Sequence, residues 1–362
     1  MKKILIVYTR FNYGEVTYGG LSKMLLWLGN NLATNGYDVT FCTVYDKTPT
    51  SRILCPAKSI TLGVKYYTNF LMRNSTIFIQ VMYLLAREMR KGRYDYVISF
   101  GDITFHNCLF LRKFFKYKFI VSERADPNFD HSSFGRLKRK NYKFVDTLVC
   151  QTEGAKKFFS RDIQKISCVI PNPIDIPNIK WDRRNTKKEI ACVGRIHFWQ
   201  KRQDVLVDAF EQFHKVHSDY RLNIYGGGED INRLKDLIIE NCLNEFIVVH
   251  GSVNNVREKL LENEVFVLTS AFEGIPNALL EAMSLGMPVV STKCSPGGAE
   301  FLITHGVNGL LAECNNPDDI SSKLCQIIEN PQEADAMAAS ARISLERFSS
   351  SNIIKLWKKI FK

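Results

Sequence analysis

The chain has 362 residues, of which 45% are hydrophobic and 24% charged. This composition is typical of a soluble globular protein with room for two domains, and no run approaches the roughly 20 apolar residues that span a bilayer. The net charge of +12 arises in the first half, because residues 1–180 hold 28 Lys and Arg against 13 Asp and Glu, and the rest hold 21 against 24.

Signals for export, disulfides and metals are weak. The apolar run 4–8 after Met1 is too short for a secretion signal, and no cleavage site follows it. The ten cysteines include no C-x-x-C pair, so we expect reduced thiols in a cytoplasmic protein and no zinc site. No D-x-D occurs and no His, Cys and acid cluster has ligand spacing, so we expect no metal and no other cofactor.

Short apolar runs alternate with helical patterns along the first half. Strands are predicted at 4–8, 38–44, 95–100, 118–122, 147–151 and 167–170, and helices at 20–35 and 76–90. This alternation predicts a parallel sheet with crossover helices, whose ligands bind beyond the carboxyl ends of the strands.

Two kinds of candidate residue follow these first strands. Gly19 and Gly20 open the first helix and would let the backbone approach a phosphate or sugar, although tight packing of the turn explains them equally well. Later loops carry polar residues that are candidates for an acceptor-side base or a hydroxyl clamp: Asp102, His106, Glu123 and Arg124. The alternatives are a structural histidine and a salt bridge between Glu123 and Arg124 or to the other domain.

Basic residues of the first half are interleaved with aromatic ones in three clusters, at 65–73, 110–118 and 136–143. This mixture suits an anionic membrane surface such as the inner leaflet. A solvated basic face is the plainer alternative, and a nucleic-acid surface is disfavoured because no nucleic-acid motif accompanies the charge.

A linker rich in Pro and polar residues, 171–185, precedes a second alternating half. Strands are predicted near 189–194, 221–225, 246–250, 264–269 and 288–291, and helices near 202–217, 230–242, 254–262 and 276–286. We therefore predict an α/β protein with an acceptor-binding domain at 1–172 and a second domain at 173–345. The C-terminal helix 346–362 is expected to pack back on the first domain.

The loops of the second half carry cations and glycines. Gly194 with Arg195, Lys201 and Arg202 follow the strand 189–194, and these cations could neutralise a leaving diphosphate. Gly226 begins a Gly-Gly-Gly turn that would allow close approach to a nucleobase or phosphate.

The segment from Glu273 to Glu281 is the most informative part of the chain. Glu273 is predicted on a strand-to-helix loop and Glu281 about a turn and a half into the helix, with Pro276 near the first turn. The N–H groups of Gly274, Ile275 and Asn277 then form an anion site at a helix N-terminus. Carboxylates on both sides of an anion site suit a nucleotide-sugar. The Gly-rich stretch before Glu300 offers a further N–H nest.

Together these loops resemble the retaining nucleotide-sugar glycosyltransferases of family 4, of the bacterial surface-polysaccharide type. The resemblance is strongest from Val193 to Leu311 and implies the GT-B fold, two doubly wound Rossmann-like domains facing a central cleft. It implies that Arg195 and Lys201 hold the diphosphate, that Glu281 accepts from the ribose hydroxyls, and that Glu273 with the amides after it holds the transferred sugar. It also implies catalysis without a metal.

The resemblance predicts a hexosyltransferase of class EC 2.4 for lipopolysaccharide or capsule synthesis. Such an enzyme would move a hexose or N-acetylhexosamine from a UDP-sugar to a polyprenyl-diphosphate-linked or other saccharide acceptor. It would act in the cytoplasm, at the inner face of the membrane, without a nucleic-acid partner. The alternatives are a GT-B sugar-nucleotide epimerase or phosphorylase, and a basic nucleic-acid-binding protein.

Overall fold

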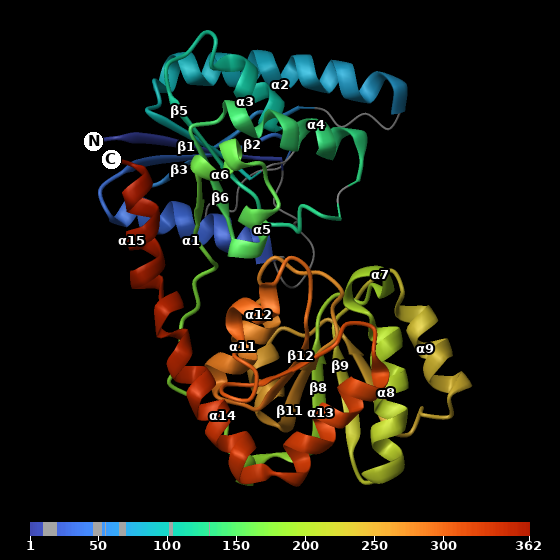
Figure 1. The fold of residues 1–362 in the computed structure, drawn as a ribbon. Coiled ribbons are helices and arrows are strands. Elements are labelled where there is room, and N and C mark those ends of the chain that lie inside the picture. Colours follow the sequence, from blue (N-terminus) through green and yellow to red (C-terminus); the bar gives the residue numbers. More distant parts are fainter. Residues whose placement is uncertain (10–19, 46–52, 55, 65–69, 101–103, 130) are drawn as a thin grey trace. The chain divides into compact units, whose positions relative to one another are not determined.

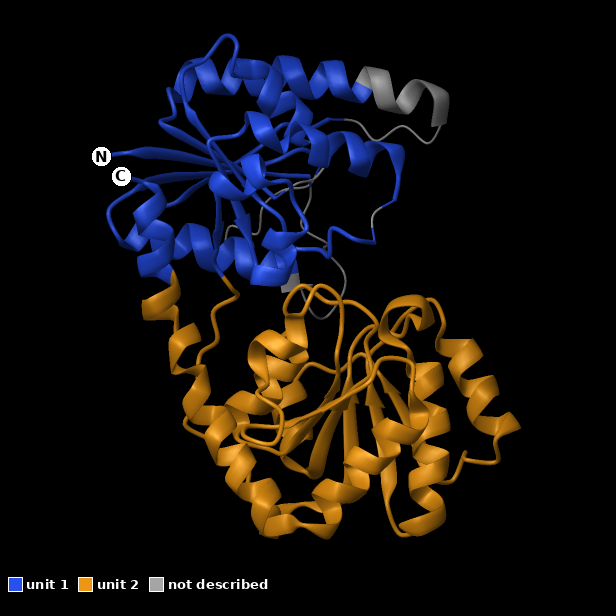
Figure 2. Ribbon diagram, in the orientation of Figure 1, with its two compact units in different colours: residues 1–170, 354–362 blue, residues 171–353 orange. Residues whose placement is uncertain are grey.

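In a computed structural model the chain forms two compact units (Figure 2). Unit 1 comprises Met1–Ile170 and Ile354–Lys362, and unit 2 comprises Pro171–Ile353. The structure describes residues 1–9, 20–45, 53–54, 56–64, 70–100, 104–129 and 131–362. No helix in these ranges is both long and apolar enough to cross a bilayer.

Unit 1 is built on one parallel sheet, with strand order β3-β2-β1-β4-β5-β6-β7 (Figure 1). Its strands are β1 (Lys3–Tyr8), β2 (Asp38–Thr43), β3 (Lys58–Thr61), β4 (Tyr96–Ser99), β5 (Lys118–Ser122), β6 (Thr147–Cys150) and β7 (Ser167–Val169). The central strands are buried along almost their whole length, which is why they read as continuous apolar runs.

Helices cover both faces of this sheet. They are α1 (Gly20–Thr34), α2 (Phe70–Gly92), α3 (Thr104–Leu111), α4 (Ser133–Asn141), η2 (Tyr142–Phe144), α5 (Glu153–Lys157), α6 (Arg161–Lys165) and the end of α15 (Ser350–Ile360). In Figure 1, α2, α3 and α4 lie on one face and α1 on the other. Phe361 packs edge-on against Tyr96, with ring centroids 5.1 Å apart, so the C-terminus belongs to this unit's core.

Unit 2 repeats the plan with a six-stranded parallel sheet of order β10-β9-β8-β11-β12-β13. The strands are β8 (Lys187–Val193), β9 (Arg221–Tyr225), β10 (Ile247–Gly251), β11 (Asn263–Leu268), β12 (Val289–Thr292) and β13 (Leu310–Ala312). The helices are η3 (Arg183–Asn185), α7 (Phe198–Lys201), α8 (Gln203–Val216), α9 (Ile231–Glu240), α10 (Val256–Leu261), α11 (Asn277–Leu285), α12 (Gly298–Leu302), α13 (Pro317–Glu329), α14 (Pro331–Ser344) and η4 (Leu345–Phe348). A hydrophobic core cluster of this unit joins the sheet to α8, α9 and α13.

Local chemistry explains where these helices begin. Asn316 caps α13, since its side-chain oxygen accepts from the N–H of Asp319, 3.1 Å away, and Pro317 fills the first turn. The helix predicted near 202–217 is α8, whereas the short helix α7 before it was not predicted; Arg202, with a positive φ of 52°, separates the two. The edge strands β3 and β13 were not predicted, and their four and three residues are too few to show a period.

Candidate functional site

Four loops of unit 2 leave the carboxyl ends of β8, β9, β11 and β12, which are joined in one parallel sheet. The loops after β8 and β11 carry the predicted cations and the two predicted glutamates. This edge is where open parallel sheets bind ligands, so the predicted donor residues of unit 2 gather on one side of its sheet.

Lys201, the last residue of α7, forms an ion pair with Glu273. The two side chains are only 16% and 11% exposed, and the Ser270 hydroxyl donates to the same Glu273 oxygen at 3.0 Å. Lys201 lies over Gly194, with its Cε 3.6 Å from where a Cβ on that glycine would stand. The structure therefore joins three predicted residues at one point, with a cation held beside a carboxylate.

Backbone contacts fix this pair in place. The Thr269 hydroxyl at the end of β11 donates to the carbonyls of Lys201 and Arg202, at 2.9 and 3.1 Å. The N–H of Ala271 donates to the carbonyl of Gln200 at 2.8 Å. The strand exit that carries Glu273 is thus tied to the short helix that carries Lys201, and neither side chain has to be ordered when a ligand arrives.

The helix α11 begins at Asn277, directly after the loop that carries Glu273. Pro276 stands at its N-cap and provides no side-chain cap, and Ile275 and Pro276 are buried. Among the described residues, no acceptor takes the N–H groups of Gly274, Ile275 and Asn277. The unpaired amides on which the predicted anion site depends are therefore present, and anion binding there stays a prediction.

Glu281 lies in the same helix, one turn after Asn277, and is half-buried. Residues four apart share a face of a helix, so Glu281 and Asn277 lie on the same side of α11. The Asn277 side chain accepts a hydrogen bond of 2.8 Å from Asn172, a linker residue that sequence reasoning did not single out. The local structure predicted for Glu273 to Glu281 is confirmed.

The loop after β12 packs against the loop that carries Glu273. The N–H of Glu273 donates to the carbonyl of Ser295 at 2.8 Å. A Cβ on Gly298 would stand 2.3 Å from the carbonyl oxygen of Gly274, so only glycine allows this contact. Glu300 is exposed and accepts from the N–H of Cys294 at 3.3 Å. Burial, and secondly the Glu273 charge, raise the pKa of Cys294 to about 12, so this thiol is a poor nucleophile.

The glycine turn after β9 is pressed against the loop after β8. A Cβ on Gly226 would stand 1.9 Å from the carbonyl oxygen of Gly194, and one on Gly228 would stand 2.0 Å from that of Ile196. Gly226 also has a φ of +144°, which side chains rarely adopt. The close approach observed at these glycines is to the protein's own backbone, and the donor contact of Gly226 stays a prediction.

Replacing Gly228 with alanine should therefore displace the loop that positions Lys201. We expect a lower melting temperature and loss of ligand binding at this edge, because the new Cβ would overlap the backbone of Ile196, which has no rotamer that avoids the clash. Gly227→Ala is the matched control, since its Cβ would meet only the Ser252 hydroxyl, at 3.0 Å. Equal melting temperatures for the two variants, measured by thermal denaturation, would show that the contact does not matter.

The two predicted arginines of this edge differ in their surroundings. Arg202 makes a two-point ion pair with Asp204, at 3.1 and 3.0 Å, and also donates to Asn315. It is therefore held within the protein, and its donor contact stays a prediction. Arg195 is exposed, and its side chain makes no hydrogen bond or ion pair with any residue that the structure describes. Its guanidinium group is therefore available to pair with an anion from solvent.

Sequence reasoning also placed candidates in unit 1, of which Gly19 and Asp102 lie outside the described residues. Gly20 is the first residue of α1. His106 in α3 lies between the rings of Phe105 and Phe134, and its Nε2 is 3.4 Å from the Asn141 amide. Burial, and secondly Lys138, lower the pKa of His106, so it is neutral near pH 7.

Glu123 and Arg124 do not pair with each other. Glu123 is 6% exposed and accepts from the Tyr142 hydroxyl, and its Oε2 lies 3.3 Å from the Lys138 ammonium. Arg124 donates to the Ser122 hydroxyl at 2.8 Å and lies over the Trp357 ring. Burial lowers the pKa of Arg124 to about 10. The alternative of a salt bridge between the two neighbours is therefore wrong, because Glu123 points toward Lys138 of α4.

Comparison with known proteins finds relatives that cover most of the chain. Residues 175–344 match the family model described as glycosyl transferases group 1. An uncharacterized glycosyltransferase of Haemophilus influenzae is 28% identical over 94% of this chain and 96% of its own length. The lipopolysaccharide 1,6-galactosyltransferase of Salmonella typhimurium is 30% identical over 68% of this chain and 69% of its own length.

The fold has a close counterpart among solved structures. The Anabaena protein HepE, solved in complex with UDP and glucose, superposes with a TM-score of 0.80 at 18% identity, over 100% of this chain and 99% of that one. With the two parallel sheets observed here, this likeness confirms the predicted class of two doubly wound Rossmann-like domains, the GT-B fold.

Proposed function

Because this chain belongs to the glycosyl transferases group 1 family, and so is a glycosyltransferase of the type that builds bacterial surface polysaccharides, we propose a specific reaction for it. The enzyme transfers a hexose or N-acetylhexosamine from a UDP-sugar to a lipid-linked saccharide, with retention of the anomeric configuration. The observation that carries this proposal is the buried Lys201–Glu273 pair beside the open amides of α11.

Each part of the donor has a partner of suitable chemistry at this edge. Lys201 and Arg195 face the diphosphate, together with the amides after Glu273, and Glu281 accepts from the ribose hydroxyls. Glu273 accepts from the hydroxyls of the transferred sugar once the ammonium of Lys201 has turned to the phosphate. UDP bound to HepE, a protein of the same fold, supports uridine as the base.

The same groups account for the chemistry. The bond between the anomeric carbon and the phosphate oxygen breaks, and the negative charge that develops on UDP is stabilised by Lys201, Arg195 and the amides. The acceptor hydroxyl forms the new bond on the same face, and its proton passes to the departing phosphate oxygen. These groups supply the positive charge themselves, so the proposal includes no metal.

A screen of nucleotide-sugars tests the donor. We expect UDP-sugars to raise the melting temperature of the protein more than GDP- or ADP-sugars do, because binding to the native state stabilises it. NMR of the product should then show a new glycosidic bond with the anomeric configuration of the donor. An isomerised nucleotide-sugar without a new bond would identify the alternative, an epimerase.

Replacing Glu281 with alanine should weaken donor binding about 10- to 100-fold, since a hydrogen bond to a charged group contributes about 1.5–3 kcal/mol. The effect should appear in the KM for the donor and not in the KM for the acceptor. Glu333→Ala is the control, because Glu333 is an exposed first-turn glutamate of α14 in the same unit. Unchanged donor affinity in Glu281→Ala would remove Glu281 from the ribose site.

We propose that the acceptor is presented at a membrane, on a face of unit 1 that we call the basic aromatic face. It is formed by exposed apolar residues of α2, α3 and α4 and the segments after them: Ile79, Tyr83, Phe110, Phe114, Phe134, Leu137 and Phe144. The helices lie on the same side of the sheet (Figure 1). Cations stand among them, with Lys113 5.4 Å from the Phe110 ring and Lys143 5.0 Å from the Phe144 ring.

This arrangement suits an anionic bilayer, where rings enter the interface and each nearby cation adds about 1 kcal/mol. We expect the protein to sediment with vesicles that contain anionic lipid and not with neutral ones. Ile79→Ser with Tyr83→Ser should reduce this binding, since both side chains are about two-thirds exposed, at 65% and 67%. Ile239→Ser with Ile343→Ser, on exposed helix positions of unit 2, is the matched control.

A further inference from the structure

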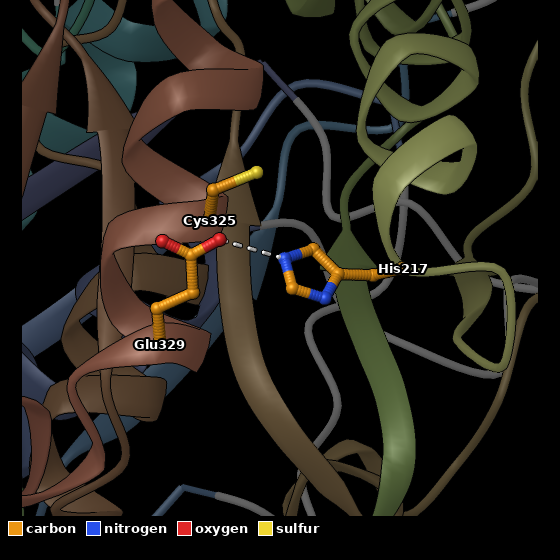
Figure 3. A group of neighbouring side chains, drawn as sticks. All are labelled: His217, Cys325 and Glu329. Atoms are coloured by element: carbon orange, nitrogen blue, oxygen red, sulfur yellow. Dashed lines mark hydrogen bonds and ion pairs between the residues drawn. The ribbon is translucent and has the colours of Figure 1, made fainter.

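A second cluster of functional groups lies in unit 2, at the opposite end of two helices from the donor loops. His217 follows α8, and Cys325 and Glu329 lie four residues apart near the end of α13. The ligand atoms of the three side chains all lie within 4.8 Å of one another. Figure 3 shows the imidazole facing the Glu329 carboxylate, with the thiol coming from the same helix as the carboxylate.

Neighbouring side chains hold two of the three metal-binding groups, the His217 imidazole and the Cys325 thiol, in place. The His217 ring lies against Phe213, with centroids 4.8 Å apart, and near Tyr220 at 6.0 Å. Cys325 packs on the core cluster of unit 2. The His217 side chain is 18% exposed and the Glu329 side chain 55%, so an ion from solvent can reach the group.

The distances suit a small tetrahedral ion. Zinc bonds of about 2.0–2.3 Å to nitrogen, oxygen and sulfur place neighbouring ligand atoms about 3.3–3.8 Å apart. The Nε2 of His217 and the Oε1 of Glu329 are 3.2 Å apart, close to the lower end of this range. The Cys325 sulfur lies within 4.8 Å of both, so the three atoms must draw together by about 1 Å at most to surround an ion.

We propose that His217, Cys325 and Glu329 bind a divalent transition-metal ion, for which zinc is the natural occupant, with water as the fourth ligand. A set of one thiolate, one imidazole and one carboxylate favours zinc or a neighbouring borderline ion over magnesium or calcium. Binding releases the thiol proton to solvent. A salt bridge between His217 and Glu329 uses only two of the three groups, whereas a metal ion engages all three.

The site would be structural. The helices α8 and α13 both begin near the donor edge, where Arg202, just before α8, donates to Asn315, just before α13. Fourteen residues of helix place His217 about 20 Å from that edge. A metal at the His217 end would join the two helices there, as the Arg202–Asn315 hydrogen bond joins them at the donor edge. It would thereby stabilise the loop of Lys201 without contacting the donor.

The test uses the whole chain, freed of metal with EDTA and titrated with zinc chloride. We expect one zinc per chain by calorimetry and by metal analysis, a higher melting temperature with zinc, and no binding of magnesium. Cys325→Ser and His217→Gln should abolish this binding, and Glu329→Gln should weaken it at least about tenfold. Cys242→Ser is the matched control, because Cys242 is a free, exposed cysteine of the same unit.

Cobalt gives a readout that does not depend on stability, since a thiolate ligand produces a charge-transfer absorption that Cys325→Ser must lose. Should a variant fail to fold, alkylation of the wild-type protein replaces it, and zinc should protect Cys325 while Cys242 reacts. Zinc binding that is equal in wild type, Cys325→Ser and His217→Gln would overturn the proposal. So would the absence of zinc binding to the wild-type chain, or protection of both cysteines.

Discussion

Replacing Lys201 with alanine is expected to lower the rate of sugar transfer about 100- to 1000-fold, the usual cost of removing one group that stabilises charge in a transition state. A hydrogen bond from the Thr269 hydroxyl at the end of β11 to the carbonyl of Lys201 holds this residue in place, and only 16% of its side chain is exposed. Arg202 cannot replace it, because Arg202 is paired with Asp204. Initial rates with a UDP-sugar and acceptor measure the effect.

Two further variants separate chemistry from stability. Lys201→Ala leaves Glu273 without its ion-pair partner, so part of any loss could come from the fold. The double variant Lys201→Met with Glu273→Gln removes both charges and should melt close to the wild type while transferring no sugar. Lys293→Ala removes an exposed lysine paired with Glu313 in the same unit and should keep full activity. Near wild-type turnover in Lys201→Ala would end the role proposed for it.

Replacing Lys138 with methionine is expected to destabilise unit 1 by about 3–5 kcal/mol, the cost of leaving a buried carboxylate without its partner. The side chains of Lys138 and Glu123 are 10% and 7% exposed, and among the residues that the structure describes the Tyr142 hydroxyl is the one other side-chain donor to this carboxylate. For a unit of this size the melting temperature should fall by roughly 6–20 °C. Thermal denaturation followed by circular dichroism measures it.

The matched variants again isolate the cause. Lys138→Met with Glu123→Gln should recover most of the stability, since no charge is then buried. Lys140→Met changes an exposed lysine of the same helix and should have almost no effect. Because Glu123 is also a candidate on the acceptor side, the transfer rate of the double variant tests that role separately. A single Lys138→Met variant as stable as the wild type would mean that the Lys138–Glu123 pair does not contribute to stability.

The alternation of apolar runs was enough to predict both sheets, because buried parallel strands carry few polar residues. The loops at their carboxyl ends followed from topology alone, and so did the position of Glu273 before a helix and Glu281 within it. Short edge strands such as β13 carry no such pattern, and the left-handed turn at Arg202 depends on contacts with Asp204 and Asn315 that a residue type does not reveal.

Pairings between distant side chains were the least predictable part. The alternatives to a site role for Glu123 were a pair with Arg124 or with the other domain, and instead it meets Lys138, one of several lysines in a basic cluster. His217 and Glu329 are 112 positions apart, so their meeting depends on how α8 and α13 pack. The sequence contained a pattern that could predict part of this cluster only within α13, where Cys325 and Glu329 share a helix face.

The ion pair between Lys201 and Glu273 also has a consequence for product release. In the proposed reaction, the carboxylate recaptures the ammonium when the spent nucleotide departs, so the charge of Lys201 is neutralised again in the empty site. Glu273 thus competes with the leaving product for the same group. An enzyme arranged in this way favours release of its by-product and resists occupation by stray anions between turnovers.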